Sequence, residues 1–282
     1  MQSSRLSASR LPGRIISGWA MCVLAGCALV QSPAERAGEI ALAAGFMPIE
    51  LTDLRLRAFH KRPIDKSAKR LVVYIESDGA PWPWPDVPPA DPTPLKPLVI
   101  SLAAADPAPA VAYLSRPCQY LPENQLANCD PEFWMAGRFR EDLVAATSSA
   151  VETLKRLSHA SDVSLVGYSG GGAMAALVAA RRDDVKCLVT VAAPLDIAAW
   201  TDSIGVSRLR HSLNPADVAA RLKYLPQTHF RGMADQTVPP LSASRFLASV
   251  PTARVIDRIE FDHQCCWLRD WALLREQSCL RQ

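Results

Sequence analysis

Short apolar runs rich in Val, Ile, Leu and Tyr alternate with helical patterns along the chain after residue 70. Apolar strands separated by helical segments are typical of a mostly parallel sheet. The runs predict strands at 71–76, 110–115, 162–168, 186–193, 227–232 and 253–261. Helices are predicted at 34–44, 97–104, 138–158, 171–181, 241–249 and 264–277. The pattern therefore predicts an α/β fold, a mostly parallel sheet flanked by helices on both faces, with an antiparallel ribbon at 46–60.

Two long segments do not follow this alternation. The first, 77–97, contains eight prolines, and the second, 194–226, lies between two predicted strands. Loops at the carboxyl ends of parallel strands border the ligand crevice in open α/β sheets, and long loops in compact domains are often functional. We therefore expect both segments to be excursions over a site, with 194–226 as a lid or cap segment. Ordinary surface connections are the alternative.

The first 26 residues have the composition of an export signal. A basic, Ser-rich stretch precedes an apolar run at 15–23, and the letters LAGC follow at 24–27. The run is too short to span a bilayer as a helix, which takes ~20 residues. LAGC resembles the lipobox of bacterial lipoproteins, which implies cleavage before Cys27 and its acylation. Because Ala28 follows, and not Asp, the resemblance points to the outer membrane, facing the periplasm. A plain cleaved signal is the alternative.

The net charge of the chain comes from this leader. The sequence has 31 Lys and Arg against 28 Asp and Glu, and residues 1–26 hold three arginines and no acid. Subtracting 3 from 31 leaves 28 basic and 28 acidic residues beyond the leader. A formally neutral protein does not attract a polyanion, so nucleic acid is not an expected partner.

Six cysteines follow Cys27, an unusual number for a cytosolic enzyme but typical of an oxidising compartment. Cys118 and Cys129 bracket a short polar segment without the periodicity of a helix or strand, and we expect this pair to be bonded. Closing such a loop would contribute ~3 kcal/mol. Sequence does not choose the connectivity of the other four, Cys187, Cys265, Cys266 and Cys279. No C-x-x-C pair or H-E-x-x-H motif is present, so no metal site is predicted.

A strand, a sharp turn and a helix meet at the letters GYSGG, residues 167–171. The apolar run 162–168 precedes the turn, and helix-forming residues follow it. The G-x-S-x-G spacing suits such a turn because small residues on both sides of the Ser let the strand and the helix approach without a clash. Ser169 would project above the sheet, and the Gly170 N–H at the helix N-terminus would face an oxyanion. We therefore predict Ser169 as a nucleophile.

A Ser hydroxyl needs a general base, and His263 is the best placed of the five histidines. The order expected for this motif is nucleophile, then acid, then histidine. His60 and His159 precede the nucleophile. His229 falls inside a predicted strand, where a packing role is expected, and His211 lies in the long excursion. His263 follows the last predicted strand, at the edge where the crevice is expected.

Asp235 is the predicted acid. It lies in the turn after the strand 227–232, where the Gly and Pro of GMADQTVP direct the carboxylate toward the imidazole. Asp196 and Asp202 follow the preceding strand and are the alternatives. Asp262, beside the histidine, would point away from it if the strand extends that far, because successive side chains alternate between faces.

These motifs together resemble the α/β-hydrolase superfamily from about residue 70 to 277. The resemblance rests on GYSGG around Ser169, GMADQTVP around Asp235 and DHQCCW around His263. With LAGC, the chain resembles the exported lipoprotein hydrolases of proteobacteria. The implied organisation is a lipoprotein signal peptide at 1–26, a tether and N-terminal helix at 27–45, and a single α/β-hydrolase domain at 46–282.

The superfamily takes a second oxyanion donor from the loop after its third strand, often at an HG motif. This chain has ESDGAPW at 76–82, with Asp78 where His is common. The donor is a backbone N–H, so the resemblance still implies Gly79 or Ala80 in that role. A simple turn is the alternative.

The implied chemistry is acyl transfer to water through an acyl-enzyme, without a cofactor. Ser169 would attack a carbonyl, His263 would take and return the proton, and Asp235 would fix the imidazole tautomer. The resemblance favours carboxylic esters, and thioester or amide cleavage are the alternatives of the same fold.

A small acyl ester is therefore the expected substrate, and Trp82, Trp84 and Trp200 are candidate walls of its pocket. The expected membrane contact is the lipid anchor on Cys27. A catalytically silent, hydrolase-like envelope lipoprotein that binds a ligand or partner is the rival from another class. Sequence leaves the oligomeric state open.

Overall fold

The computed structural model describes residues 31–51, 55–61, 68–80 and 87–281. The predicted signal peptide and Cys27 lie outside these residues. The described residues all belong to one folded unit. None of the helices in these ranges combines the length and the apolar character needed to cross a bilayer.

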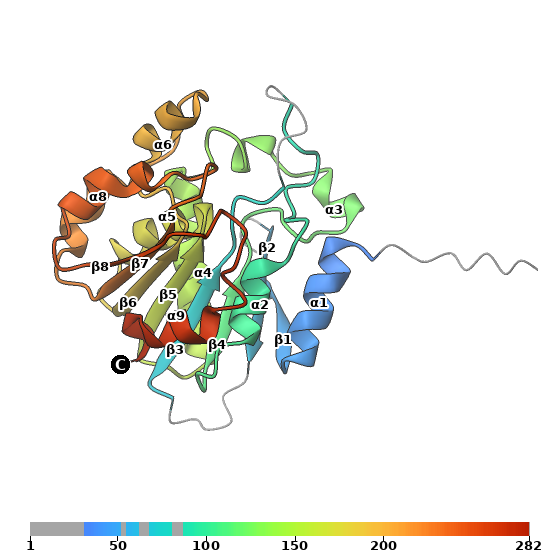
Figure 1. Cartoon of the computed structure of the whole chain (residues 1–282). Coiled ribbons are helices and arrows are strands. Elements are labelled where there is room, and N and C mark those ends of the chain that lie inside the picture. The colour runs from blue at the N-terminus through green and yellow to red at the C-terminus, as the bar shows by residue number, and fades with distance from the viewer. Residues whose placement is uncertain (1–30, 52–54, 62–67, 81–86, 282) are drawn as a thin grey trace, which may run out of the picture. The chain divides into compact units, whose positions relative to one another are not determined.

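An eight-stranded sheet forms the centre of the unit (Figure 1). Its strands are β1 (Phe46–Leu51), β2 (Leu56–Lys61), β3 (Arg70–Ile75), β4 (Val111–Leu114), β5 (Asp162–Tyr168), β6 (Val185–Val191), β7 (Gln227–Gly232) and β8 (Arg254–Arg258). Their spatial order is β1-β2-β4-β3-β5-β6-β7-β8. β2 pairs antiparallel with β1 and with β4, and every pair from β4 across to β8 is parallel. The predicted mostly parallel sheet is confirmed, and the antiparallel ribbon predicted at 46–60 forms its edge.

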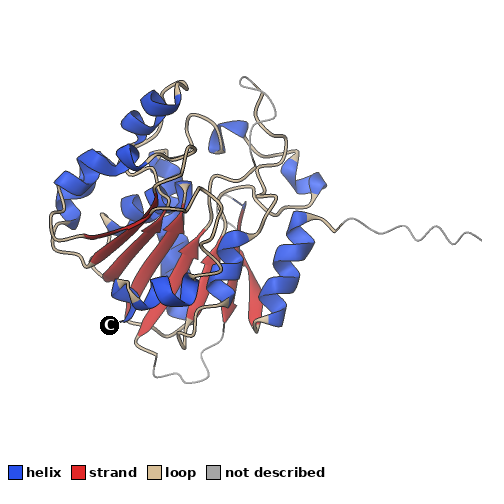
Figure 2. Ribbon diagram, viewed as in Figure 1, coloured by secondary structure: helices blue, strands red, loops and turns tan. Residues whose placement is uncertain are grey.

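Helices cover both faces of the sheet because its strands are apolar on both sides (Figure 2). In β3, Leu71, Val73 and Ile75 pack into one core cluster, and Val72 and Tyr74 pack into the other. Adjacent residues of a strand point to opposite faces, so a single strand contributes to both cores.

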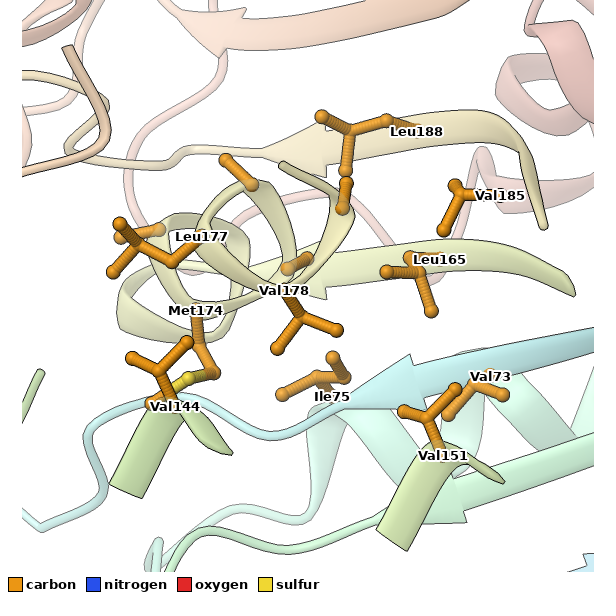
Figure 3. Packing of buried hydrophobic residues seen from close by; sticks show 14 of the residues in the cluster. Val73, Ile75, Val144, Val151, Leu165, Met174, Leu177, Val178, Val185 and Leu188 are labelled. Carbon is orange, nitrogen blue, oxygen red and sulfur yellow. The ribbon is translucent and has the colours of Figure 1, made fainter. Parts of the chain in front are cut away.

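The first core lies between the sheet and the helices α4 (Glu141–Leu157) and α5 (Gly170–Ala179), with α7 (Pro215–Val218) and α8 (Ser244–Ala248) beside them. Figure 3 shows Val144 of α4 beside Met174 of α5, and Val151 of α4 beside Val73 of β3. Every residue of α5 is buried, as expected of a helix that is apolar on all sides. The helix after the Ser169 turn is therefore fixed in the centre of the molecule.

The second core lies on the opposite face, under α1 (Pro33–Ala43), α2 (Leu98–Ala104) and α9 (Trp271–Glu276). Ser32 caps α1: its hydroxyl accepts the Glu35 N–H, and the Glu35 carboxylate accepts the Ser32 N–H. The loops carry the short elements α3 (Glu123–Leu126), α6 (Ile197–Ile204), η2 (Pro131–Phe133), η3 (Ala219–Leu222), η4 (Pro240–Ala243) and η5 (Cys279–Arg281).

The C-terminal third differs most from the prediction. The predicted strand at 253–261 ends at Arg258, and the predicted helix at 264–277 begins only at Trp271. Asp262 Oδ1 accepts the N–H groups of Gln264 and Cys265 over 2.7 and 2.6 Å. An Asp that bonds the backbone a few residues ahead makes a turn and competes with a helix. The predicted helix at 241–249 is divided into η4 and α8.

Three disulfides join the six cysteines that follow Cys27. The pairs are Cys118–Cys129, Cys187–Cys279 and Cys265–Cys266. The first is the pair predicted from sequence. The second joins β6 to η5 across 92 residues of sequence, and no local pattern indicates a bond between elements so far apart in the chain.

Candidate active site

Ser169 lies at the sharp turn between β5 and α5. Its backbone has φ 53° and ψ −129°, a conformation that L residues adopt rarely. Its N–H donates to the Val191 carbonyl oxygen over 2.9 Å. A Cβ on Gly167 would lie 2.2 Å from the Gly171 carbonyl oxygen, so the turn has room only for glycine. The turn holds the Ser169 side chain at the carboxyl end of β5, where the G-x-S-x-G spacing places it.

His263 lies in the loop after β8, and two side chains hold its backbone. The Tyr168 hydroxyl donates to the His263 carbonyl oxygen over 2.6 Å, and Trp267 Nε1 donates to the same oxygen over 3.1 Å. The rings of Tyr168 and His263 also pack together, with 5.2 Å between their centroids. The residue directly before Ser169 in the sequence therefore fixes the loop that carries the histidine.

Asp235 is buried in the turn after β7. Its Oδ1 accepts the N–H groups of Thr237 and Val238 over 2.9 and 2.8 Å. Two backbone donors on one oxygen fix the plane of the carboxylate. The second oxygen, Oδ2, faces His263.

The structure brings Ser169, Asp235 and His263 together. His263 Nδ1 lies 2.8 Å from Asp235 Oδ2, and His263 Nε2 lies 3.1 Å from Ser169 Oγ. Both distances are within hydrogen-bonding range. An imidazole placed between a carboxylate and a hydroxyl can accept the hydroxyl proton at Nε2, while the carboxylate holds the tautomer that has its proton on Nδ1. The arrangement is able to activate the Ser169 hydroxyl as a nucleophile.

The alternative acids are engaged elsewhere. Asp196 pairs with Arg245 over 2.9 Å, and Asp202 pairs with Arg208 over 2.6 Å. Asp262 accepts the backbone N–H groups of its own loop. Among the described residues, none of the three carboxylates hydrogen-bonds the imidazole.

Other histidines lie apart from this arrangement. His211 is exposed and pairs with Glu132 over 3.0 Å. His229 is buried in β7, where its Nδ1 lies 2.8 Å from Thr190 Oγ1, which agrees with the expected packing role. In the part of the chain that the structure describes, no group of three or more His, Cys, Asp or Glu side chains could hold a metal ion.

The structure distinguishes among the three predicted oxyanion donors by the hydrogen bonds that their N–H groups already make. Gly170 begins α5, so its N–H has no intrahelical acceptor. Gly79 has φ 98°, and a Cβ there would lie 1.7 Å from the Pro92 carbonyl oxygen. The Ala80 N–H donates to that Pro92 oxygen over 3.2 Å. Ala80 is therefore already bonded in this conformation, and Gly79 remains the candidate for the second donor.

The predicted pocket residues can be placed only in part, because Trp82 and Trp84 lie outside the described residues. Trp200 is half-buried on α6, and its Nε1 donates to the Thr237 carbonyl oxygen over 2.8 Å. That oxygen belongs to the same turn as Asp235. Trp200 therefore stabilises the turn that carries Asp235. Its part in a substrate pocket stays a prediction.

Sequence reasoning missed a polar network under the site. Glu76 is buried, and the hydroxyls of Tyr113 and Tyr120 donate to its Oε2 over 2.8 and 3.0 Å. Burial raises the pKa of Glu76 above its ordinary value, although these hydrogen bonds oppose the shift. Asp78, two residues further on, pairs with two arginines. The only sequence signal was the Asp at a position where the superfamily often has His.

Comparison with known proteins gives structural matches alone. No family model and no curated protein matches the sequence. Est1E from Butyrivibrio proteoclasticus is similar in structure with a TM-score of 0.60 at 13% identity, over 83% of this chain and 96% of the Est1E chain. The Pyrococcus furiosus esterase Pf2001 gives a TM-score of 0.58 at 12% identity, over 94% of this chain and 95% of the esterase.

A peptidase shows the same likeness. The acylaminoacyl peptidase of Pyrococcus horikoshii gives a TM-score of 0.58 at 14% identity and covers 84% of this chain, but this chain matches only 42% of the peptidase. Identities this low show the fold and not the activity. Together with the order of the sheet and the helices on both faces, these likenesses show that the chain has the α/β-hydrolase fold.

Proposed function

We propose that this protein is a serine hydrolase that cleaves carboxylic esters through an acyl-enzyme. One observation carries the proposal. Asp235, His263 and Ser169 form a chain of two hydrogen bonds, 2.8 Å from carboxylate to imidazole and 3.1 Å from imidazole to hydroxyl. The α/β-hydrolase fold supports the proposal, because this fold presents such a chain at the carboxyl ends of its strands.

In the proposed mechanism, Ser169 Oγ attacks the carbonyl carbon while His263 Nε2 takes its proton. The Asp235 carboxylate stabilises the resulting imidazolium, and the N–H groups of Gly170 and Gly79 stabilise the oxyanion. The imidazolium then returns its proton to the leaving alcohol as the C–O bond breaks. Water, deprotonated by His263, attacks the acyl-enzyme, and His263 then returns that proton to Ser169 Oγ as the acyl C–O bond breaks and the acid is released.

Esters are the proposed substrates because two of the similar structures, Est1E and Pf2001, are named as esterases. Because an acylaminoacyl peptidase is also similar in structure, amides are the substrate class to compare with esters. An amine is a poorer leaving group than an alcohol, so the same Ser, His and Asp cleave an ester more readily than an amide unless the site binds the amide specifically. A panel of p-nitrophenyl esters and aminoacyl amides separates the two classes.

Replacing the nucleophile tests the proposal. In the full-length protein, Ser169→Ala should lower turnover of p-nitrophenyl acetate and butyrate by about 10³-fold or more, because the attacking oxygen is removed. The matched control is Ser164→Ala in β5, the strand that precedes Ser169, since the Ser164 hydroxyl is buried and has no hydrogen-bond partner among the described residues. Ser164→Ala should keep turnover within about twofold of wild type. Equal turnover by wild type and Ser169→Ala would contradict the proposal.

We also propose that Cys27 carries a lipid anchor that holds the protein in the envelope. The support is the LAGC sequence at the end of the leader, because several acyl chains at ~0.8 kcal/mol per buried CH₂ bind a membrane stably. Metabolic labelling with palmitate should mark the wild-type chain and not Cys27→Ala. Equal labelling of the two chains would contradict the anchor without affecting the catalytic proposal.

A further inference from the structure

A buried ion-pair cluster of one carboxylate and two guanidinium groups lies beside the candidate active site. Asp78 follows β3, Arg116 follows β4, and Arg138 precedes α4. Arg116 Nη1 lies 2.9 Å from Asp78 Oδ1, and Arg138 Nη1 lies 3.1 Å from Asp78 Oδ2. The side chains of Arg116, Arg138 and Asp78 are 4, 10 and 20% exposed. Charges this well removed from water are retained only with close partners.

The Asp78 carboxylate packs against the first residue of α5. A Cβ on Gly170 would lie 2.0 Å from Asp78 Oδ1 and 2.5 Å from Oδ2. The carboxylate therefore sits directly beside the backbone of Gly170, whose N–H is the first proposed oxyanion donor. Gly79, which carries the second proposed donor, is the next residue after Asp78. The cluster thus joins the two segments that form the proposed oxyanion hole.

A lone carboxylate at this place would oppose the chemistry, because a negative charge near a forming oxyanion raises its energy. Two guanidinium groups around one carboxylate leave the cluster with a net charge of +1. Burial opposes ionisation of Asp78, but Arg138 and Arg116 hold the pKa of its carboxyl below the usual value. In a water-poor site, charges act more strongly than in solution. The two arginines therefore make the net charge beside the forming oxyanion positive, which stabilises the oxyanion.

Other contacts hold the cluster in one position. Gln119 Nε2 donates to the Ser77 and Pro92 carbonyl oxygens over 3.0 and 3.3 Å. Gln119 Oε1 accepts the backbone N–H of Arg116 over 3.0 Å. Arg138 Nε donates to the Met135 carbonyl oxygen over 2.7 Å. Gln119, from the same segment as Arg116, therefore holds Ser77 directly, and it also holds the Pro92 carbonyl oxygen that accepts the Ala80 N–H.

Backbone strain is concentrated in that segment. Cys118 and Tyr120 have φ 66° and 61° without being glycine, and the Cys118–Cys129 disulfide closes the segment. Residues held at positive φ persist only when their surroundings determine them, and they cluster at functional sites.

We propose that Arg116 and Arg138 are positioning residues for the hydrolytic reaction, which hold Asp78 and the backbone at Gly79 against Gly170 and keep this side of the oxyanion hole positive. The inference rests on the proposed function, because an oxyanion forms only if Ser169 attacks a carbonyl. It also explains why this chain tolerates Asp at position 78: the partners of that carboxylate come from two other loops.

Arg138→Met in the full-length protein tests the proposal. Removing this guanidinium leaves the cluster neutral and one Asp78 oxygen without its partner. We expect kcat for a p-nitrophenyl ester to fall by about 10- to 100-fold with KM within about threefold, because the lost interaction acts on the transition state and not on the bound substrate. Arg138→Lys restores a cation without the forked geometry and should recover part of the lost kcat.

Arg182→Met is the matched control. Arg182 pairs with Asp184 over 2.6 Å, and their side chains are 9 and 21% exposed, close to the values for Arg138 and Asp78. This pair lies between the end of α5 and the start of β6, at the opposite end of the sheet from Ser169. Arg182→Met should lower the free energy of unfolding to a similar extent and leave kcat within about twofold of wild type. A merely structural role for Arg138 would give the two variants the same kcat.

The outcomes separate this inference from the proposed function. If wild type hydrolyses no ester and fluorophosphonate does not label Ser169, the proposed function fails. If wild type is active and folded Arg138→Met has the wild-type kcat, the positioning role is overturned, and an equal loss of kcat in Arg182→Met overturns it as well. Should Arg138→Met not fold, Arg138→Gln replaces it, since its amide is polar and uncharged, and a similar loss of kcat is expected.

Discussion

Tyr168 connects the proposed nucleophile with the proposed base. It immediately precedes Ser169, and its hydroxyl donates to the His263 carbonyl oxygen over 2.6 Å. The G-x-S-x-G spacing treats this position as unspecified, so the sequence gives no reason to assign it a partner. The partner exists only because the loop after β8 folds back over the end of β5. A hydroxyl that fixes the histidine loop should matter more for catalysis than for folding.

Tyr168→Phe measures this contact. Losing one buried hydrogen bond of ~1 kcal/mol from the histidine loop should lower kcat/KM for a p-nitrophenyl ester by about 3- to 10-fold. Tyr74→Phe is the control, because the Tyr74 hydroxyl also donates over 2.6 Å but to Asp106, outside the site. Tyr74→Phe should leave kcat/KM within about twofold. Equal losses in the two variants would show that Tyr168 has no specific role.

The strands that precede the Ser169 and Asp235 turns match their predicted bounds. The strand predicted at 162–168 is β5 at the same bounds, and the strand predicted at 227–232 is β7 at the same bounds. The run in β5 is largely apolar and buried, as in a strand covered on both faces, whereas β7 reads QTHFRG and is largely polar although most of its residues are buried. The helix predicted at 264–277 was wrong over its first half because Asp262 bonds the backbone ahead of it. Apolar spacing does not report such a side-chain turn.

β7 carries a histidine that makes stability depend on pH. Burial lowers the pKa of His229 from 6.5 to about 3, and nearby Arg231 adds to the shift. Its pKa in the folded state is therefore below that in the unfolded state, so the unfolded state binds more protons between these values. The contribution of His229 to the free energy of unfolding is fully present above pH 6.5 and is lost as the pH falls toward 3.

His229→Gln should remove this dependence. The free energy of unfolding of wild type should fall by about 2 kcal/mol more than that of the variant between pH 7 and pH 5, since each pH unit below the unfolded pKa contributes ~1.4 kcal/mol. Urea titrations of both proteins at the two pH values measure the difference. The same fall in both proteins would mean that His229 does not remain neutral in the folded state.

At the scale of the whole molecule, the α/β-hydrolase fold brings three distant turns to one end of the sheet. Ser169 follows β5, Asp235 follows β7 and His263 follows β8, and these strands are parallel neighbours or near neighbours. Parallel strands end at the same edge, so the G-x-S-x-G spacing, the turn residues around Asp235 and the order of the strands together selected the three residues. The cluster around Asp78 was not predictable, because its arginines lie on loops whose positions depend on packing across the entire fold.

The most direct test of the central claim is the location of a covalent label. The full-length protein is treated with a fluorophosphonate, digested and mapped by mass spectrometry, in parallel with His263→Ala. A hydroxyl activated by the imidazole 3.1 Å away should give wild type labelled at Ser169 and His263→Ala labelled far more slowly. An unlabelled wild type, or a label on another residue at the same rate in both proteins, would contradict the proposed Ser169, His263 and Asp235 mechanism.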